Sequence, residues 1–249
     1  MNPGATPRVL VTGGTGTLGH EVIPALDARG IPAVVLSRRP GPDTRVGDLD
    51  SGEGVAEALD GIETVIHLAA GRSQPREART LVSAGRATSI RHLVFISIVG
   101  IDEIPFGYYR AKRAAERVIE GSGLPASVLR TTQFHQFVAG FFSAQRFSPV
   151  VVTPALSVQP IDTRTVADRL VELAVGPPSG RVSDLGGPEV LTGREIAWLY
   201  QAHRGWRRPT IPFGLPGATW AAFAQGYQLV PKNRSGGRTF AQFLATPAS

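Results

Sequence analysis

Short apolar runs alternate with longer amphipathic segments over the first 130 residues. The runs are rich in Val, Ile and Leu, a composition typical of strands that are buried on both faces. The segments between them carry apolar residues three and four positions apart, the spacing of one helical face. The pattern predicts strands at 9–12, 33–36, 46–49, 64–68, 92–97 and 126–130, and helices that include 22–26, 54–59, 77–88 and 108–120. Strands and helices in this alternation predict an α/β fold with a doubly wound parallel sheet.

The chain beyond residue 130 is less regular. Residues 134–142 are rich in aromatic side chains, 160–162 have the pattern of a short returning strand, and 164–175 have that of an amphipathic helix. Thr192 and Glu195 have the spacing of a capping box, which predicts a helix over 196–202. Because no repeat or linker divides the chain, we expect a single domain over 1–249. It would consist of a core of about 7–155 and a small C-terminal lobe of about 156–249.

A glycine-rich turn joins the first strand to the first helix. Glycines at this place permit a positive φ and let a phosphate approach the backbone, and the amides at the start of the following helix attract an anion. The spacing fits both forms of the dinucleotide-binding fingerprint, G-x-G-x-x-G and G-x-x-G-x-x-G. We therefore expect a pyrophosphate to bind at Gly13, Thr15, Gly16, Thr17, Leu18 and Gly19.

The second strand ends in Ser37, Arg38 and Arg39. A carboxylate at this position selects NAD by binding the ribose 2′-hydroxyl, whereas arginine accommodates a 2′-phosphate. The absence of a carboxylate here favours NADP(H) as the cofactor.

Two further segments follow strands at the same edge of the sheet. Asp48 has two interpretations, either as a hydrogen-bond acceptor for the adenine amino group, with Leu49 packed on the ring, or as the N-cap of the next helix. Ala69, Ala70 and Gly71 are small residues at a point where a cofactor would pass close to the backbone. All five are candidate cofactor-binding residues.

Composition narrows the class of protein. The chain of 249 residues has a net charge of +6 but no cysteine, which excludes disulfides and thiolate chemistry. The arginines are scattered and no nucleic-acid-binding motif accompanies them, so we expect no nucleic-acid partner. The five histidines show no metal-ligand spacing. The sequence has no pattern of a leader segment and no apolar run long enough to span a membrane, so we expect a cytoplasmic protein that does not bind a membrane.

The basic residues include only two lysines, Lys112 and Lys232. Lys112 lies four residues after Tyr108, so a helix places both side chains on one face. An ammonium next to a phenol favours the phenolate, which would lower the pKa of Tyr108 and suit it to proton transfer. Lys112 would also bind the nicotinamide ribose, and Ser97, at the end of the preceding strand, would orient a substrate carbonyl. There are two alternatives: Tyr108 and Lys112 stack on each other at the surface, or Tyr109 is the functional tyrosine in place of Tyr108.

The sequence resembles the atypical short-chain dehydrogenase/reductases, specifically the NmrA-like NAD(P)H-binding group. The resemblance rests on residues 12–19, 67–70, 95–100, 108–112 with Glu116, 129–134 and 162–167. It implies a Rossmann-type fold, a C-terminal substrate lobe and an NADP-linked role, with the catalytic serine, tyrosine and lysine at Ser97, Tyr108 and Lys112. The gap from Ser97 to Tyr108 is shorter than in the well-known short-chain enzymes, and several members of the group act as redox sensors without turnover.

Two functional hypotheses follow. The first is an NADPH-dependent reductase of a small ketone or quinone, with Tyr108 as proton donor. The second is a non-catalytic NADP(H) sensor that binds a protein partner. The aromatic side chains in the C-terminal half fit either a hydrophobic substrate pocket or a hydrophobic core. His135 could likewise line the pocket or pack in the core. The sequence determines neither the substrate nor the oligomeric state.

Overall fold

The computed structural model describes residues 9–71, 73–88 and 90–246. Contacts between Cα atoms divide them into two compact units. Unit 1 contains the described residues up to Ser97 together with Arg110–Leu129 and Val166–Val182. Unit 2 contains Ile98–Tyr109, Arg130–Thr165 and the described residues from Ser183 onward. Each unit is therefore assembled from separate stretches of the chain.

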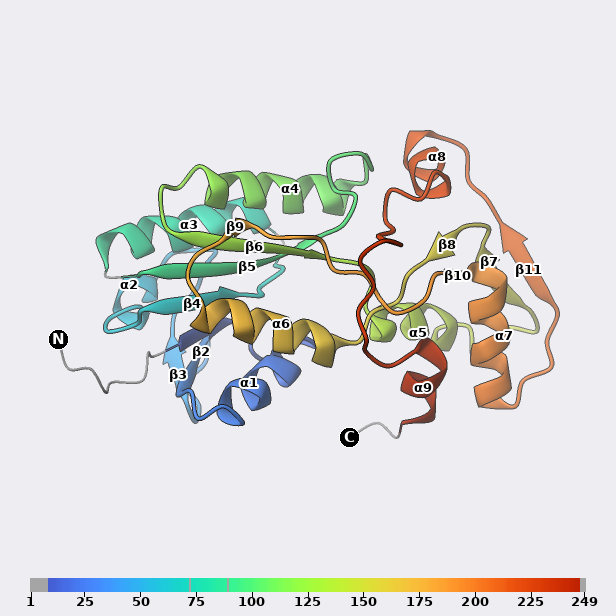
Figure 1. Ribbon diagram of the computed structural model, residues 1–249, viewed down its shortest axis with the longest axis horizontal. Coiled ribbons are helices and arrows are strands. Elements are labelled where there is room, and N and C mark those ends of the chain that lie inside the picture. Colours follow the sequence, from blue (N-terminus) through green and yellow to red (C-terminus); the bar gives the residue numbers. More distant parts are fainter. Residues whose placement is uncertain (1–8, 72, 89, 247–249) are drawn as a thin grey trace. The chain divides into compact units, whose positions relative to one another are not determined.

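A seven-stranded sheet organises unit 1, in the order β3-β2-β1-β4-β5-β6-β9 (Figure 1). Its pairings β3/β2, β2/β1, β1/β4, β4/β5 and β6/β9 are parallel. The helices α3 and α4 cover one face and α1 and α6 the other. The strands are β1 Val9–Thr12, β2 Ala33–Ser37, β3 Thr44–Val46, β4 Thr64–His67, β5 His92–Ile98, β6 Ala126–Thr131 and β9 Gly180–Arg181, and the helices are α1 Gly19–Asp27, α2 Val55–Ala58, α3 Gln74–Ala87, α4 Gly107–Glu120 and α6 Thr163–Val175. The prediction of a doubly wound, Rossmann-type α/β fold is confirmed.

The strand order reverses between β1 and β4. Both neighbours of β1 are parallel to it, and Thr12 at its end is in register with His67 at the end of β4. Ligands of open α/β sheets bind beyond the carboxyl ends of the strands at such a reversal. The glycine-rich turn and the small residues 69–71 follow the two strands that flank the reversal, whereas residues 37–39 and 48–49 follow β2 and β3.

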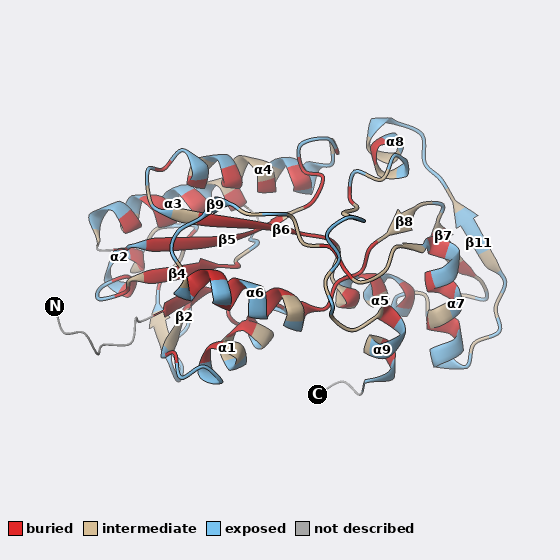
Figure 2. Cartoon of the chain, viewed as in Figure 1, coloured by how far each residue is buried: buried red, intermediate tan, exposed pale blue. Residues whose placement is uncertain are grey.

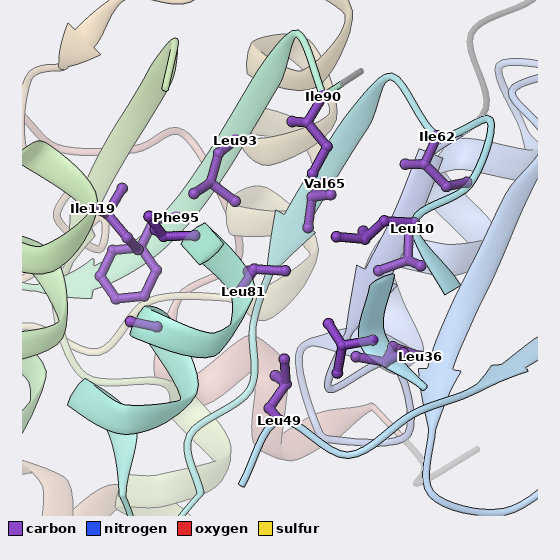
Figure 3. Close-up of a cluster of buried hydrophobic side chains, with 14 of the residues drawn as sticks. Leu10, Leu36, Leu49, Ile62, Val65, Leu81, Ile90, Leu93, Phe95 and Ile119 are labelled. Carbon is purple, nitrogen blue, oxygen red and sulfur yellow. The ribbon is translucent and has the colours of Figure 1, made fainter. Parts of the chain in front are cut away.

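The core of unit 1 explains why the apolar runs predict the strands so well. Figure 2 shows β4, β5 and β6 buried along most of their length, and every residue of β1 and β4 is buried. Side chains from the sheet interlock with those of α2, α3 and α4 (Figure 3). The labelled members are Leu10, Leu36, Leu49, Ile62, Val65, Leu81, Ile90, Leu93, Phe95 and Ile119.

Unit 2 contains small sheets and short helices. β8 pairs antiparallel with β10, and β7 pairs in parallel with β11. The capping box at Thr192 and Glu195 is confirmed, and it opens a helix slightly longer than predicted. The elements are α5 His135–Ser143, β7 Val151–Pro154, β8 Ser157–Val158, β10 Leu191–Thr192, α7 Gly193–Arg204, β11 Thr210–Phe213, α8 Ala218–Ala224 and α9 Phe240–Ala245.

Two predicted strands differ from the structure. The third strand ends at Val46 rather than continuing to residue 49, because Asp48 N–H donates to Glu53 O in a turn. The returning strand expected at 160–162 reduces to a single bridge between Ile161 and Phe134. In both places a buried apolar residue, Leu49 or Ile161, lies outside an extended ladder.

Candidate functional site

The glycine-rich turn brings the end of β1 against the loop that follows β4. Gly13 has a φ of +71°, and a Cβ there would lie 2.8 Å from the Ala69 nitrogen. A Cβ at Gly19 would lie 2.3 Å from the carbonyl oxygen of Gly14, so α1 starts in direct contact with the turn. Two of the predicted glycines are therefore required by close backbone packing, as well as by any ligand.

The start of α1 is open to an anion. Leu18 is the N-cap residue and provides no side-chain hydrogen bond to the first amides of the helix. Thr15, Gly16 and Thr17 are exposed, and Gly16 N–H donates to Gly13 O to close the turn. His20 N–H and Glu21 N–H already donate to Gly16 O and Leu18 O, so the positive end of the helix dipole and the exposed backbone of the turn are the features that fit the pyrophosphate of a dinucleotide.

The residues after β2 form a compact polar turn. Arg39 N–H donates to Ser37 Oγ at 3.1 Å, which holds the turn together. Both arginines are exposed. Two exposed guanidinium groups next to a hydroxyl fit a phosphate group better than they fit a sugar hydroxyl.

Asp48 and Leu49 have structural partners of their own. Asp48 Oδ1 accepts a hydrogen bond from Asp50 N–H at 2.9 Å, and Leu49 packs in the core of unit 1. The alternative in which Asp48 caps the next helix is wrong, because the N-cap of α2 is Gly54. Contact with adenine remains a prediction for both residues.

A buried hydrogen bond joins the two strands at the reversal. Thr12 Oγ1 lies 2.7 Å from His67 Nδ1 and accepts from Ala69 N–H at 3.3 Å, so we assign the hydroxyl hydrogen to His67. Burial lowers the pKa of His67 to about 3, and the charge of Lys112 adds to this effect. His67 is therefore a neutral, packed histidine, and it stacks on Phe95.

The small residues after β4 lie against a carboxylate. Gly71 N–H donates to Glu77 Oε2 at 3.2 Å, and a Cβ at Gly71 would lie 1.7 Å from Glu77 Oε1. Glu77 is buried, and this burial raises its pKa. The predicted segment of Ala69, Ala70 and Gly71 is thus held in place from the first turn of α3.

Lys112 is buried inside unit 1. Its side chain is 3% exposed, and its Nζ lies 4.6 Å from the centre of the Phe95 ring. Burial lowers the pKa of Lys112 to about 8, while the charges of Glu77 and Glu116 act in the opposite direction. A lysine that is buried next to an aromatic ring has a specific environment, which distinguishes it from a solvated surface lysine.

Ser97 does not present a free hydroxyl. Its Oγ–H donates to Glu116 Oε2, and both residues are buried. The other oxygen, Glu116 Oε1, accepts from Arg113 at 2.9 Å. The predicted role of Ser97 in orienting a substrate carbonyl requires its hydroxyl to leave Glu116.

The two neighbouring tyrosines differ in environment. Tyr108 is 44% exposed, and Tyr109 is buried against Phe106 and Phe223. Burial raises the pKa of both phenols, that of Tyr109 to about 12. The expectation that the pKa of Tyr108 is lowered is therefore wrong in direction. Tyr109 serves the core of unit 2, and Tyr108 shares the helix α4 with Lys112, four residues apart.

Of the two interpretations of His135, the structure favours a packed core residue over a residue that lines a substrate pocket. It is fully buried, stacks on Phe243 and lies 2.9 Å from the Arg238 carbonyl oxygen through Nε2. Within the described ranges, no group of three or more acidic, histidine or cysteine side chains is arranged to hold a metal ion. Over the same ranges, no helix has the length and apolar character needed to cross a bilayer.

Glu77 and Glu116 are the residues whose place in the site the sequence analysis missed. Both belong to helices that it predicted, and Glu116 lies four residues beyond Lys112. That spacing is a usable signal, because it places an acidic group on the same helical face as an important lysine. The position of Glu77 depends on how α3 meets the loop after β4, which the local sequence does not reveal.

Comparison with known proteins gives a consistent result. The family model described as NAD(P)H-binding matches residues 13–174. The (4-alkanoyl-5-oxo-2,5-dihydrofuran-3-yl)methyl phosphate reductase of Streptomyces griseus is 29% identical over 202 residues, which cover 75% of this chain and 70% of that protein. The NAD(P)H azoreductase of Xenophilus azovorans is 25% identical over 97% of this chain and 98% of its own length.

A solved structure supports the fold. The NADPH-dependent quinone oxidoreductase of Escherichia coli, in complex with NADPH, superposes with a TM-score of 0.80 at 18% identity, over 95% of this chain and 98% of that chain. The predicted resemblance to the atypical short-chain dehydrogenase/reductases is thus confirmed. With its glycine-rich turn, its sheet reversal and a family match over more than half of its length, this chain belongs to the NAD(P)H-binding family.

Proposed function

We propose that the protein is an NADPH-dependent reductase of a small, hydrophobic carbonyl compound such as a ketone or quinone. The observation that carries the proposal is the buried lysine Lys112, which shares one face of α4 with the partly exposed Tyr108. The relatives named above, a reductase and an azoreductase, support the class of reaction. The C-terminal lobe would bind the substrate.

The chain would bind the cofactor through four segments. The start of α1 and Gly13, Thr15, Gly16, Thr17, Leu18 and Gly19 would bind the pyrophosphate. Arg38 and Arg39, with Ser37, would bind the 2′-phosphate, which favours NADP(H) over NAD. Asp48 and Leu49 would lie by the adenine, and Ala69, Ala70 and Gly71 would lie against the middle of the dinucleotide.

The chain's own residues would complete the reaction. NADPH, when bound, supplies the hydride that is transferred to the carbonyl carbon. Tyr108 would donate its phenolic proton to the carbonyl oxygen, so that the product is an alcohol. Lys112 would bind the nicotinamide ribose and stabilise the tyrosinate left behind, which then takes up a proton from water.

Two observations favour the alternative of a non-catalytic NADP(H) sensor. Ser97 is engaged by Glu116, and burial raises the pKa of Tyr108, so neither group is prepared for proton transfer to a substrate. A sensor needs only the cofactor-binding segments. It would distinguish NADPH from NADP and would tolerate the loss of the Tyr108 hydroxyl.

The decisive assay follows NADPH oxidation by absorbance with a panel of ketones, quinones and aldehydes. We expect Tyr108→Phe to bind NADPH normally and to lose turnover about 100-fold, the usual contribution of a general acid. Tyr227→Phe is the matched control, because Tyr227 is also 44% exposed. Equal turnover by Tyr108→Phe and wild type refutes the proton-donor role. NADPH binding by both proteins without any turnover across the panel supports the sensor.

Cofactor preference has its own test. Replacement of Arg38 and Arg39 by alanine should weaken NADPH binding about 10- to 100-fold and leave NADH binding nearly unchanged, because only the 2′-phosphate contacts are lost. Replacement of Arg204 and Arg207 by alanine removes two other exposed arginines and therefore matches the change in net charge. A parallel loss for both cofactors would contradict the assignment.

A further inference from the structure

Four arginines and one phenylalanine come together on the surface of unit 2. Arg146 and Phe147 belong to the turn that follows α5, and Arg204, Arg207 and Arg208 lie at the end of α7 and before β11. Hydrogen bonds join the two stretches, because the Arg208 guanidinium donates to three carbonyl oxygens of the turn at 2.8 to 3.0 Å. We call these five residues the basic patch.

The turn that carries Phe147 is held in place by its neighbours. Besides the contacts of Arg208, the Gln145 side chain donates to Val152 O at 3.1 Å and accepts from Val152 N–H at 2.7 Å. Phe147 itself is 87% exposed, the highest value among the large apolar side chains of the described ranges. A bare aromatic ring on a backbone that is fixed in this way indicates a binding surface.

The arginines of the basic patch lack acidic partners. Arg146, Arg204 and Arg207 are exposed, and Arg208 is half-buried. In the ranges 9–71, 73–88 and 90–246, none of the four forms an ion pair with a carboxylate. The hydrogen bonds of Arg208 end on neutral carbonyl groups, so they leave its charge in place. The patch therefore concentrates positive charge that the chain itself does not neutralise.

Aromatic rings hold the guanidinium groups close together. The guanidinium carbon of Arg208 lies 3.9 Å from the centre of the Trp206 ring, and that of Arg204 lies 5.9 Å from the same point. The guanidinium carbon of Arg146 lies 4.5 Å from the centre of the Phe147 ring. Trp206 is thus covered by arginine, and Phe147 is the ring that the patch presents to a partner.

This combination fits the surface of an anionic lipid bilayer. An apolar ring can enter the boundary between headgroups and acyl chains, while guanidinium groups bind the phosphates around it. Single-stranded nucleic acid is bound by a series of stacking rings, and here only Phe147 is available. A second copy of this chain would bring the same positive charge against the patch.

We propose that the basic patch docks the protein on an anionic membrane surface, with Phe147 inserted among the lipids and its four arginines on the headgroup phosphates. The sequence analysis expected no membrane partner because the arginines are scattered, but folding brings together Arg146 and Arg208, which are 62 residues apart. Docking of this kind needs no spanning helix. The inference concerns unit 2 alone and does not rest on the proposed function.

The test is co-sedimentation of the full-length protein with vesicles. We expect binding to vesicles of phosphatidylcholine and phosphatidylglycerol in equal parts, little binding to phosphatidylcholine alone, and weaker binding at high salt. Replacement of Arg204 and Arg207 by glutamine should weaken binding about 10- to 30-fold. Phe147→Ser, which leaves the net charge unchanged, should weaken it about tenfold. No binding of wild type to the anionic vesicles overturns the proposal.

A matched variant separates the patch from the net charge of the chain. Replacement of Arg79 and Arg117 by glutamine removes two exposed arginines from α3 and α4 of unit 1. Its vesicle affinity should stay within about twofold of wild type, since these side chains lie outside the patch. An equal loss in this control and in the patch variant would mean attraction by net charge alone and overturns the proposal, as does wild-type affinity in Phe147→Ser.

Insertion of the ring has a spectroscopic readout. Phe147→Trp should show a shift of its emission to shorter wavelength on anionic vesicles, after subtraction of the wild-type spectrum from the three native tryptophans. An unchanged difference spectrum overturns the insertion. If single-stranded RNA or polyglutamate binds the patch and the vesicles do not, the patch serves another partner and the proposal fails. NADPH binding should be equal in wild type and in all patch variants, so failure of the proposed function would leave this result intact.

Discussion

Replacement of Gly19 by alanine tests whether the turn before α1 tolerates any side chain. The added Cβ would lie 2.3 Å from Gly14 O and 2.4 Å from Gly14 C, whereas ordinary contacts begin at 3.4 Å. The obstacle is backbone, so the turn and the helix must separate by about 1 Å. Overpacking of this kind costs about 1–3 kcal/mol, against a gain of at most about 1 kcal/mol from the better helix propensity of alanine.

We therefore expect Gly19→Ala to lower the free energy of unfolding by about 1–2 kcal/mol, and the melting temperature by about 2–8 °C. Urea unfolding measures the first and calorimetry the second. Displacement of the amides at the start of α1 should also weaken NADPH binding by about tenfold, which corresponds to about 1.4 kcal/mol.

Gly107→Ala is the control for this variant. Gly107 is likewise the first residue of its helix, and a Cβ there would have no atom within 4 Å. We expect its stability to equal or exceed that of wild type. The reasoning about close packing is refuted if Gly19→Ala is as stable as Gly107→Ala.

Three further predictions concern local interactions and pH. Thr192→Ala should lower the free energy of unfolding by about 1 kcal/mol in urea titrations, because it removes the capping box of α7, and a loss below about 0.3 kcal/mol would contradict this. The folded His67 stays neutral down to a pH of about 3, so stability should fall as the pH drops below about 6.5, where the unfolded chain takes up the proton. His67→Leu should show a shallower decline between pH 7 and 5, and equal slopes would show that His67 is not the group responsible. Because the folded Lys112 releases its proton near pH 8 and the unfolded one only near 10.5, wild type should gain stability relative to Lys112→Met over that interval, and parallel curves would contradict the lowered pKa.

Five strands of the unit 1 sheet, β1, β2, β4, β5 and β6, were predictable because they are nearly continuous apolar runs, whereas β9 contains no apolar side chain and was not predicted. Each run ends at a turn, and helical periodicity follows, so the local pattern agrees with the global topology. The phosphate turn was predictable for the same reason, since its glycines occur between a strand and a helix. The third strand was misplaced because Leu49 is apolar and buried without belonging to a ladder.

The site was less predictable where it depends on packing between distant elements. Lys112 was identifiable because the chain has only two lysines. The direction of the pKa shift of Tyr108 was not predictable from its spacing of four residues from Lys112, because burial of the phenol dominates and raises this pKa. Similarly, no local pattern shows that Ser97 donates to Glu116 or that Glu77 accepts from Gly71. These contacts are set by how α3 and α4 pack on the sheet.

Because the chain passes back and forth between its two units, neither unit can be produced as one continuous fragment. The boundaries fall after Ser97, Tyr109, Leu129, Thr165 and Val182, so the backbone changes unit five times. A fragment that ends at residue 155 would lack β9 and the part of α6 that belongs to unit 1, and it would leave their apolar partners exposed to water. No single cut yields either unit intact. Gene fusions, split reporters and truncation libraries should therefore treat the chain as indivisible, and circular permutation is the more promising way to place new ends in it.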